Sequence, residues 1–378
     1  MTDLPADATL VGRLWRRDIG PCLVTVRDGR LYDITTPAAP TMRDLLEQPD
    51  IPGFVAGVAG NDLGPVAPFL SQREPAPGST HLLAPCDLQA VKACGVTFAR
   101  SMIERVIEER AGGDPARAAD IRTRIAGAIG DSLRALVPGS AQAAEVKQML
   151  QAEGLWSQYL EVGIGPDAEV FTKCPPMAAV GQGAAVGLHP ISRWNNPEPE
   201  VVLAVASTGR IVGATLGNDV NLRDVEGRSA LLLGKAKDNN ASAAIGPFIR
   251  LLDAGFGLDD VRRLELTLTV TGTDGFAMTG DSRMAEISRD PADLVAQTRG
   301  RHHQYPDGLM LYLGTLFAPV QDRDGPGQGF THHLGDVVMI SAPELGALVN
   351  VVRLATEAPE WVFGVGALMR NLAGRGLV

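Results

Sequence analysis

Short apolar runs separated by turns fill the chain after residue 163, and they limit its possible folds more than any other feature. The runs are rich in β-branched residues, as in EVFTK, EVVLAVA, RIVGATLG, RLELTLTVTG, LMLYLG and DVVMIS. Runs this short are typical of strands, because helices need longer periodic segments. Glycine (43 residues) and proline (26 residues) add further turns. The pattern therefore predicts a β-rich α+β fold.

Two other parts of the chain differ from this pattern of short strands and turns. Residues 1–80 contain a hairpin pattern around the turn RDGR and end in the Pro-, Gly- and Ser-rich stretch SQREPAPGST. From 98 to 160 the pattern is helical. The apolar residues of a first stretch recur at helical spacing, at Phe98, Met102, Ile103, Val106 and Ile107, and a second amphipathic stretch covers 115–136. We therefore expect a small N-terminal domain over 1–80 and a catalytic domain over 81–378 with a helical insertion at about 98–160.

Charge and cysteine content indicate the class of protein. Acidic residues outnumber basic ones by 44 to 34, and no run of Lys or Arg exceeds two residues, so we expect neither a nucleic-acid nor a membrane partner. The four cysteines show no CxxC spacing, and the N-terminus resembles no signal peptide. No apolar run approaches the ~20 residues of a membrane helix. These features predict a cytoplasmic protein with reduced thiols.

Three carboxylates in WNNPEPEVVLAVASTGRIVGATLGNDVN (194–221) form the most informative pattern. Glu198 and Glu200 are two residues apart on entry to a strand, so both side chains leave the same face. If the turn STGR closes a hairpin centred between Thr208 and Gly209, paired residues have numbers that sum to 417, and Asp219 lies opposite Glu198. An all-oxygen cluster of this kind suits Mg²⁺ or Mn²⁺ better than Zn²⁺. The alternative is a solvated strand face with incidental acids.

Lysine is scarce, with five residues against 29 arginines. A chain that prefers arginine for its solvated charges can keep lysine where a compact ammonium group matters. Lys237, after the apolar LLLGKA, is the main candidate. For Lys173 and Lys235, an ordinary surface position is an equally good interpretation.

At these residues the chain resembles the fumarylacetoacetate hydrolase family. The matching motifs are PEPE with Glu198 and Glu200, GNDVNLRD with Asp219, KDNNASAAIGP from Lys237, and a late LGT that ends at Thr315. The resemblance covers roughly residues 85–352. It implies a mixed β-sandwich-roll fold, a divalent metal held by the three acids, and substrates of the 2-oxo-acid type.

A finer resemblance points to the sugar-acid dehydratases of this family. The family's hydrolases carry a GxNYxxHxxE-like motif, but here GVTFARSMIE places Ser101 where the histidine would stand and retains Glu104. The runs SRWNNPEPE, DVEGRSALLLGKAK and EVFTK resemble instead the dehydratases of 2-keto-3-deoxy-D-xylonate and 2-keto-3-deoxy-D-arabinonate. This resemblance implies Mg²⁺-dependent formation of 2,5-dioxopentanoate (2-oxoglutarate semialdehyde) by a homodimer or homotetramer.

The same resemblance assigns roles to individual residues. Glu169 and Lys237 are the expected catalytic residues, and Ser101, Thr315 and Lys237 the expected substrate-binding residues. Glu104 is equally well explained as the polar face of its helix. The histidine pairs at 302–303 and 332–333 lie in turn-rich sequence and are interpreted as solvated loop residues.

Two alternatives remain for the function. One is a hydrolase that cleaves C–C bonds in acylpyruvate- or fumarylpyruvate-type substrates at the same metal site. The other is a non-catalytic scaffold that keeps only the fold.

Overall fold

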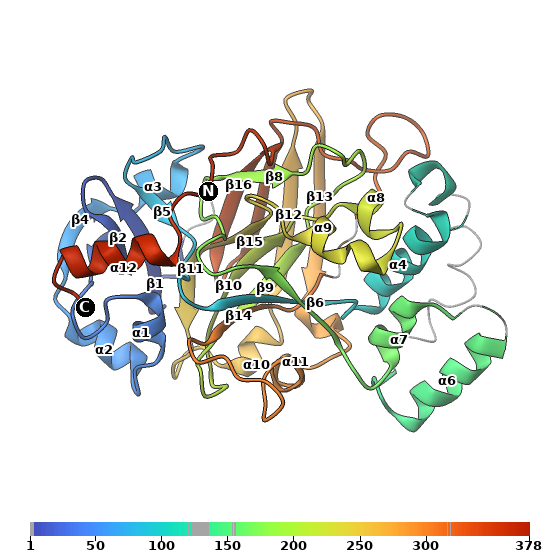
Figure 1. Cartoon of the computed structure of the whole chain (residues 1–378), viewed down its shortest axis with the longest axis horizontal. Coiled ribbons are helices and arrows are strands. Elements are labelled where there is room, and N and C mark those ends of the chain that lie inside the picture. The colour runs from blue at the N-terminus through green and yellow to red at the C-terminus, as the bar shows by residue number, and fades with distance from the viewer. Residues whose placement is uncertain are drawn as a thin grey trace.

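The computed structural model describes residues 4–112, 114–118, 121, 136–152, 154, 156–315, 317 and 319–378. Over these residues the strands form two sheets, one of eleven strands and one of five, with helices at their faces and ends (Figure 1). The β-rich prediction is confirmed. Among the described residues, every helix falls short of the length and apolar character that crossing a bilayer requires.

The larger sheet is built from distant parts of the chain. Its order is β4 (Asn61–Pro65), β3 (Arg30–Asp33), β2 (Gly20–Arg27), β1 (Leu10–Arg16), β11 (Ala243–Leu251), β10 (Ile211–Asp219), β9 (Pro199–Val205), β14 (Leu309–Tyr312), β6 (Ala90–Gly95) and β7 (Glu169–Cys174), with β5 (His81–Leu83) paired to β1. Because β1 pairs antiparallel with β11, the strands of residues 1–80 continue the same sheet. The domain boundary expected near residue 80 stays a prediction.

The smaller sheet packs against one face of the larger one. Its order is β13 (Ala277–Arg283), β12 (Glu265–Thr271), β15 (Val337–Ala342), β16 (Gly346–Leu354) and β8 (Ala185–Leu188). Along β12 every second side chain is buried, as expected for a strand with one face on the core. Those side chains share a core cluster with alternate residues of β9, the two sets being Leu266, Leu268 and Val270 on β12 and Val201, Leu203 and Val205 on β9.

Strand β9 is buried along its whole length because both of its faces are covered. Val202 and Ala204, on the face opposite Val201, join a second core cluster with residues of α1 (Met42–Leu46) and α2 (Ile51–Gly57). The acids at the start of this strand therefore have no solvent face. Buried carboxylates are costly unless cations or hydrogen bonds compensate them.

The helices are short and lie mainly in connections. In the described part of the chain they are, besides α1 and α2, α3 (Ala67–Ser71), α4 (Ala99–Ala111), α6 (Ala141–Ala152), α7 (Gln158–Ile164), α8 (Arg223–Glu226), α9 (Leu233–Lys237), α10 (Leu258–Val261), α11 (Pro291–Thr298) and α12 (Val365–Gly374), with 3₁₀ turns η1 (Ala230–Leu232) and η2 (Met284–Glu286). Helix α12 returns to the N-terminal strands, where the Asn371 amide donates to the Ile19 carbonyl (2.7 Å) (Figure 1).

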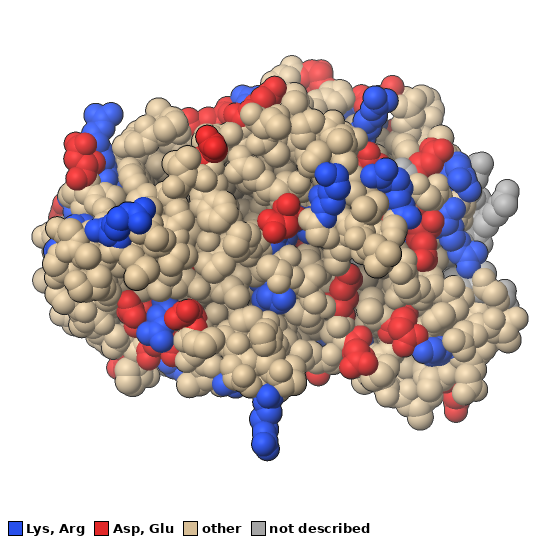
Figure 2. Space-filling model, viewed as in Figure 1, with Lys and Arg blue, Asp and Glu red and all other residues tan. Residues whose placement is uncertain are grey.

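The segment expected to be helical contains α4, α6 and α7. Met102 and Val106 of α4 pack with Leu150 of α6 and Leu160 of α7 in a cluster of their own. Most of the second amphipathic stretch, 115–136, lies outside the described residues. On the face shown in Figure 2, the described acidic and basic side chains are interspersed and form no broad basic area.

Candidate active site

The hairpin of β9 and β10 brings the three expected acids together. Next to the turn Ile211 pairs with Val205, which is one residue away from the predicted register, and a one-residue irregularity follows. From Gly213 onward the paired numbers sum to 417, and the Asp219 amide donates to the Glu198 carbonyl at 3.1 Å. The predicted pairing is therefore correct at the acids, although the irregularity rather than an even-length turn produces it.

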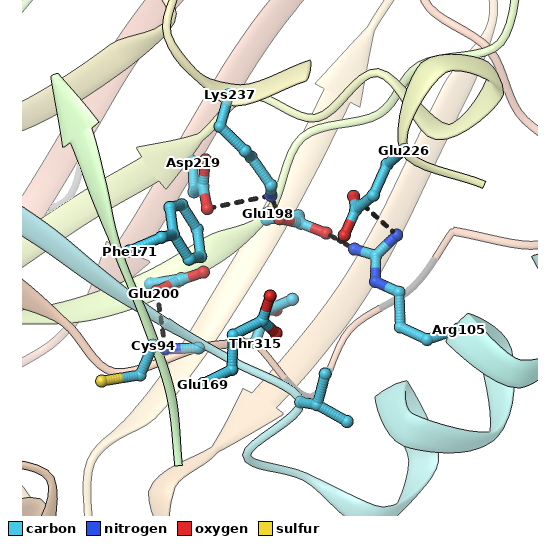
Figure 3. Close-up of a pocket in the computed structure, with 13 residues that line it drawn as sticks. Cys94, Arg105, Glu169, Phe171, Glu198, Glu200, Asp219, Glu226, Lys237 and Thr315 are labelled. Atoms are coloured by element: carbon cyan, nitrogen blue, oxygen red, sulfur yellow. Dashed lines mark hydrogen bonds and ion pairs between the residues drawn. The ribbon is translucent and has the colours of Figure 1, made fainter. Parts of the chain in front are cut away.

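The carboxylates of Glu198, Glu200 and Asp219 are all buried, and one oxygen of each lies within 4.8 Å of the others (Figure 3). The Gly314 amide donates to Glu200 Oε2 at 2.7 Å. Burial, together with Asp219 and Glu198, raises the pKa of Glu200 well above its usual range. Such a cluster of mutually repelling oxygen donors can hold a hard divalent cation, which would relieve the repulsion.

Two lysines contact this cluster from different elements. Lys237 Nζ, at the end of α9, lies 2.6 Å from Glu198 Oε2 and 3.0 Å from Asp219 Oδ2. Lys173 Nζ, on β7, lies 2.7 Å from Asp219 Oδ1 and has no exposed surface. Lys235 is exposed. The structure thus resolves the alternatives left open by the sequence: Lys173 is a core residue and Lys235 a surface one.

The charges of these groups are strongly interdependent. Burial would raise the pKa of Asp219, but Lys173 and Lys237 outweigh it and lower that pKa. Burial would lower the pKa of Lys237, but Asp219 and Glu198 raise it. Both side chains are therefore held in their ionised forms.

Glu169 faces the acids from β7, directly opposite Gly95 of β6. Burial, and then the charge of Glu226, raise the pKa of Glu169 to about 7. Its carboxylate lies over the glycine: a Cβ atom at Gly95 would stand 1.9 Å from Glu169 Oε2 and 2.7 Å from Cδ. Because Gly95 has no side chain, the Glu169 carboxylate can occupy the space where a Cβ atom would otherwise stand.

Arg105 completes the pocket and was not predicted from the sequence. Its guanidinium group hydrogen-bonds Glu198 Oε1 and lies 3.4 Å from Glu226 Oε2 (Figure 3). The signal was present, because Arg105 is three residues after Met102 and so shares the apolar face of helix α4. A lone arginine on a buried helix face indicates a buried acidic partner, but it does not say which one.

The expected substrate-binding residues are only partly described. Thr315 is buried and lines the pocket, and its hydroxyl accepts a hydrogen bond from the Phe317 amide at 3.1 Å. The side chain of Ser101 lies outside the described part of the structure. Among the described residues, the pocket is lined by Cys94, Gly95, Val96, Arg105, Glu169, Phe171, Glu198, Glu200, Asp219, Glu226, Lys237, Gly314 and Thr315.

One histidine departs from its interpretation as a solvated loop residue. His332 is buried, and its Nδ1 lies 3.1 Å from Asp336 Oδ2. Arg323 also pairs with that carboxylate, at 2.6 Å. These residues hold the loop before β15 and do not line the pocket.

The side chains that line the pocket include more acids than bases. Among the described residues these are five carboxylates, Glu169, Glu198, Glu200, Asp219 and Glu226, and two cations, Arg105 and Lys237. A bound cation would reduce this excess of negative charge, and the oxygen donors of the triad suit Mg²⁺ or Mn²⁺.

A family model described as fumarylacetoacetate (FAA) hydrolase C-terminal matches residues 165–353, half of the chain. The chain belongs to the fumarylacetoacetate hydrolase family. The matched region contains Glu169, the three acids, both buried lysines and Thr315, whereas Gly95 and Arg105 precede it.

Within this family the chain resembles sugar-acid dehydratases. It is 33% identical over 195 residues to a probable 2-keto-3-deoxyxylonate dehydratase of Haloferax volcanii and 29% identical over 185 residues to a 2-dehydro-3-deoxy-D-arabinonate dehydratase of Saccharolobus solfataricus. These matches cover 51% and 49% of this chain. They span 63% and 58% of the two relatives, less than two thirds of either length.

Solved structures confirm the expected fold. An apo form of 2-keto-3-deoxy-D-arabinonate dehydratase has a TM-score of 0.64 at 19% identity, covering 91% of this chain and 99% of that one. A structure of this dehydratase described as complexed with magnesium and 2,5-dioxopentanoate has a TM-score of 0.63 at 19% identity, with the same coverage. Fumarylacetoacetate hydrolase from Exiguobacterium antarcticum has a TM-score of 0.56 at 16% identity, covering 92% and 100%.

Proposed function

We propose that the chain is a Mg²⁺-dependent hydro-lyase that dehydrates a 2-keto-3-deoxy pentonate, derived from D-xylonate or D-arabinonate, to 2,5-dioxopentanoate. The observation that carries this proposal is that a buried triad of acids shares one pocket with a carboxyl group of pKa about 7 and a lysine. The likeness to the two dehydratases supports the choice of substrate.

Glu198, Glu200 and Asp219 would hold the metal, Mg²⁺ or Mn²⁺. When bound, such an ion acts as a Lewis acid that draws electron density from the 2-oxo group of the substrate and so acidifies C3. Lys173 holds the Asp219 carboxylate in place, because its ammonium group is fully buried and pairs with Asp219 Oδ1. The triad is thereby oriented before any substrate enters.

Glu169 is the proposed proton-transfer group. Dehydration breaks a C3–H bond and the C4–OH bond, and the hydroxyl leaves as water. A carboxylate with a pKa of about 7 is partly ionised near neutral pH, so it can accept the C3 proton and later return one. The resulting C3–C4 double bond moves to C4–C5 as C5 loses a proton and C3 regains one. The C5 enol formed in this way becomes the aldehyde when C4 gains a proton and the C5 hydroxyl loses one.

Lys237 is proposed to stabilise the enolate oxygen or to pass a proton to the leaving hydroxyl. An ammonium group can only donate hydrogen bonds, which suits an oxygen that gains negative charge. Thr315 and Ser101 are proposed to hydrogen-bond the substrate. We also propose a homodimer or homotetramer, from the family resemblance.

The direct test is to incubate the protein with 2-keto-3-deoxy-D-xylonate or 2-keto-3-deoxy-D-arabinonate and Mg²⁺ and to follow aldehyde formation. Acylpyruvate and fumarylpyruvate substrates are assayed in parallel for C–C cleavage. We expect aldehyde formation only. Cleavage of the acylpyruvates without dehydration would instead identify the protein as a hydrolase, and inactivity with both would favour a scaffold.

Magnesium is expected to stabilise the folded protein, because it binds the native triad and not the unfolded chain. At a free concentration one hundred times the dissociation constant, the gain is about 2.7 kcal/mol in the free energy of unfolding. Glu200→Gln keeps the side-chain shape but removes a ligand charge, so most of this gain should disappear. Asp259→Asn, an exposed carboxylate, is the control. Equal stabilisation of all three proteins, measured by urea unfolding, would contradict the proposed ligands.

Gly95→Ala is expected to lower kcat by about 10²-fold, since the added methyl group displaces the Glu169 carboxylate. Stabilisation by Mg²⁺ should be unchanged, because the clash is with Glu169 and not with the triad. Gly57→Ala is the matched control, since a Cβ atom there meets nothing within 4 Å. A rate equal to that of the wild type would show that the position of Glu169 does not matter.

A further inference from the structure

Arg105 connects three acids that come from three separate segments. Its guanidinium group contacts Glu198 before β9, Glu226 on α8 (3.4 Å) and Glu108 one turn along α4 (2.5 Å). The arginine side chain is 11% exposed, and the three carboxylate side chains are at most 5% exposed. Nothing else in the described pocket joins α4 to the acid triad by an ion pair.

The contact divides the two oxygens of Glu198 between two cations. Arg105 occupies Oε1, and Lys237 contacts Oε2 at 2.6 Å (Figure 3). The Glu198 carboxylate therefore has a fixed rotation, with Oε2 on the side of Asp219. Arg105 is itself held in place, because Glu108 also pairs through its other oxygen with Arg223 at 3.1 Å.

We propose that Arg105 is a positioning residue for the metal site. It orients Glu198 so that one oxygen is presented to the ion, and it makes the ion affinity depend on helix α4. This inference rests on the proposed function, since it takes Glu198 as a metal ligand.

The geometry calls for the guanidinium group and not simply for a positive charge. A planar fork with five N–H donors can hold several carboxylates at once, whereas a lysine ammonium is a compact point charge on a flexible stem. Lysine at position 105 would keep the charge but could not span Glu198, Glu226 and Glu108 together. Loss of an outer partner that orients a ligand typically weakens metal binding by about 10–100-fold.

The test measures Mg²⁺ and Mn²⁺ affinity by calorimetry for the wild type, Arg105→Lys and Arg105→Met. Arg110→Lys is the matched control, because Arg110 is on the same helix but exposed, where it donates to the Gly154 carbonyl. Urea unfolding without metal checks that each variant is folded. We expect Arg105→Lys to bind the ions about 10–100-fold more weakly and Arg110→Lys to bind them like the wild type.

The methionine variant separates orientation from charge. Removal of a positive charge alone would tighten the binding of a cation, so weaker binding in both Arg105 variants supports orientation. If Arg105→Lys binds the ions with the same affinity as the wild type, the inference is overturned and the proposed function is left intact. If Arg105→Met does not fold, the lysine variant alone decides. Failure of the wild type to bind either ion would refute the proposed metal site itself.

Discussion

Replacing Lys237 with methionine is expected to lower kcat for dehydration by about 10²–10⁴-fold. The side chain is buried, and its ammonium group contacts both Glu198 and Asp219 inside the pocket, at 2.6 Å and 3.0 Å. Methionine keeps the length and removes the donor, so the substrate oxygen that gains charge loses its partner. Steady-state aldehyde formation at saturating Mg²⁺ measures the effect.

Metal binding separates this role from a structural one. Lys237→Met should bind Mg²⁺ at least as tightly as the wild type, because the triad loses a competing positive charge. Lys235→Met is the control, since Lys235 is two residues away on the same short helix and is exposed. A variant with full activity would refute the assignment, and one that loses metal and activity together would indicate that Lys237 only holds the site in shape.

Glu169→Gln is expected to lower kcat by a similar factor of about 10²–10⁴ and to change its pH dependence. If Glu169 accepts the C3 proton, wild-type kcat/KM rises with pH through about 7, where this carboxyl ionises. The groups that set this pKa, besides burial, are Glu226, Lys237, Arg105 and Glu198. The residual activity of the glutamine variant should lack that rise, and an unchanged profile would exclude Glu169 as the proton acceptor.

The same substitution should change the pH dependence of stability. The pKa of Glu169 is higher in the folded protein than in the unfolded chain, so the folded state binds more protons between about pH 4.5 and 7. The wild type therefore loses stability as pH rises through this window, and glutamine cannot ionise. The free energy of unfolding of Glu169→Gln, measured relative to that of the wild type, should therefore increase by about 2–3 kcal/mol from pH 5 to pH 8. Urea unfolding at both pH values checks this, with exposed Glu145→Gln as the control.

The acid triad was predictable because it depends on one hairpin. Side chains alternate along strands, and neighbouring strands pair in register, so a hairpin with an even-length turn would place Asp219 opposite Glu198. The sequence did not reveal the irregularity after Ile211, which offsets the odd length of the turn. The burial of Lys173 could not be predicted in this way, because it depends on contacts with Asp219 and with backbone carbonyls far along the chain.

The sequence by itself determined the β-rich fold, the trio of neighbouring acids and the family, because these features reside in local periodicity and in motifs a few residues long. The tertiary structure decided what surrounds the trio. It set Glu169 over Gly95 by pairing β7 with β6, and it brought Arg105 from α4 to Glu198, 93 residues away in the chain. Burial and the charges of distant segments then fix the pKa of Glu169, and neither exists until the sheet and the helices are packed together.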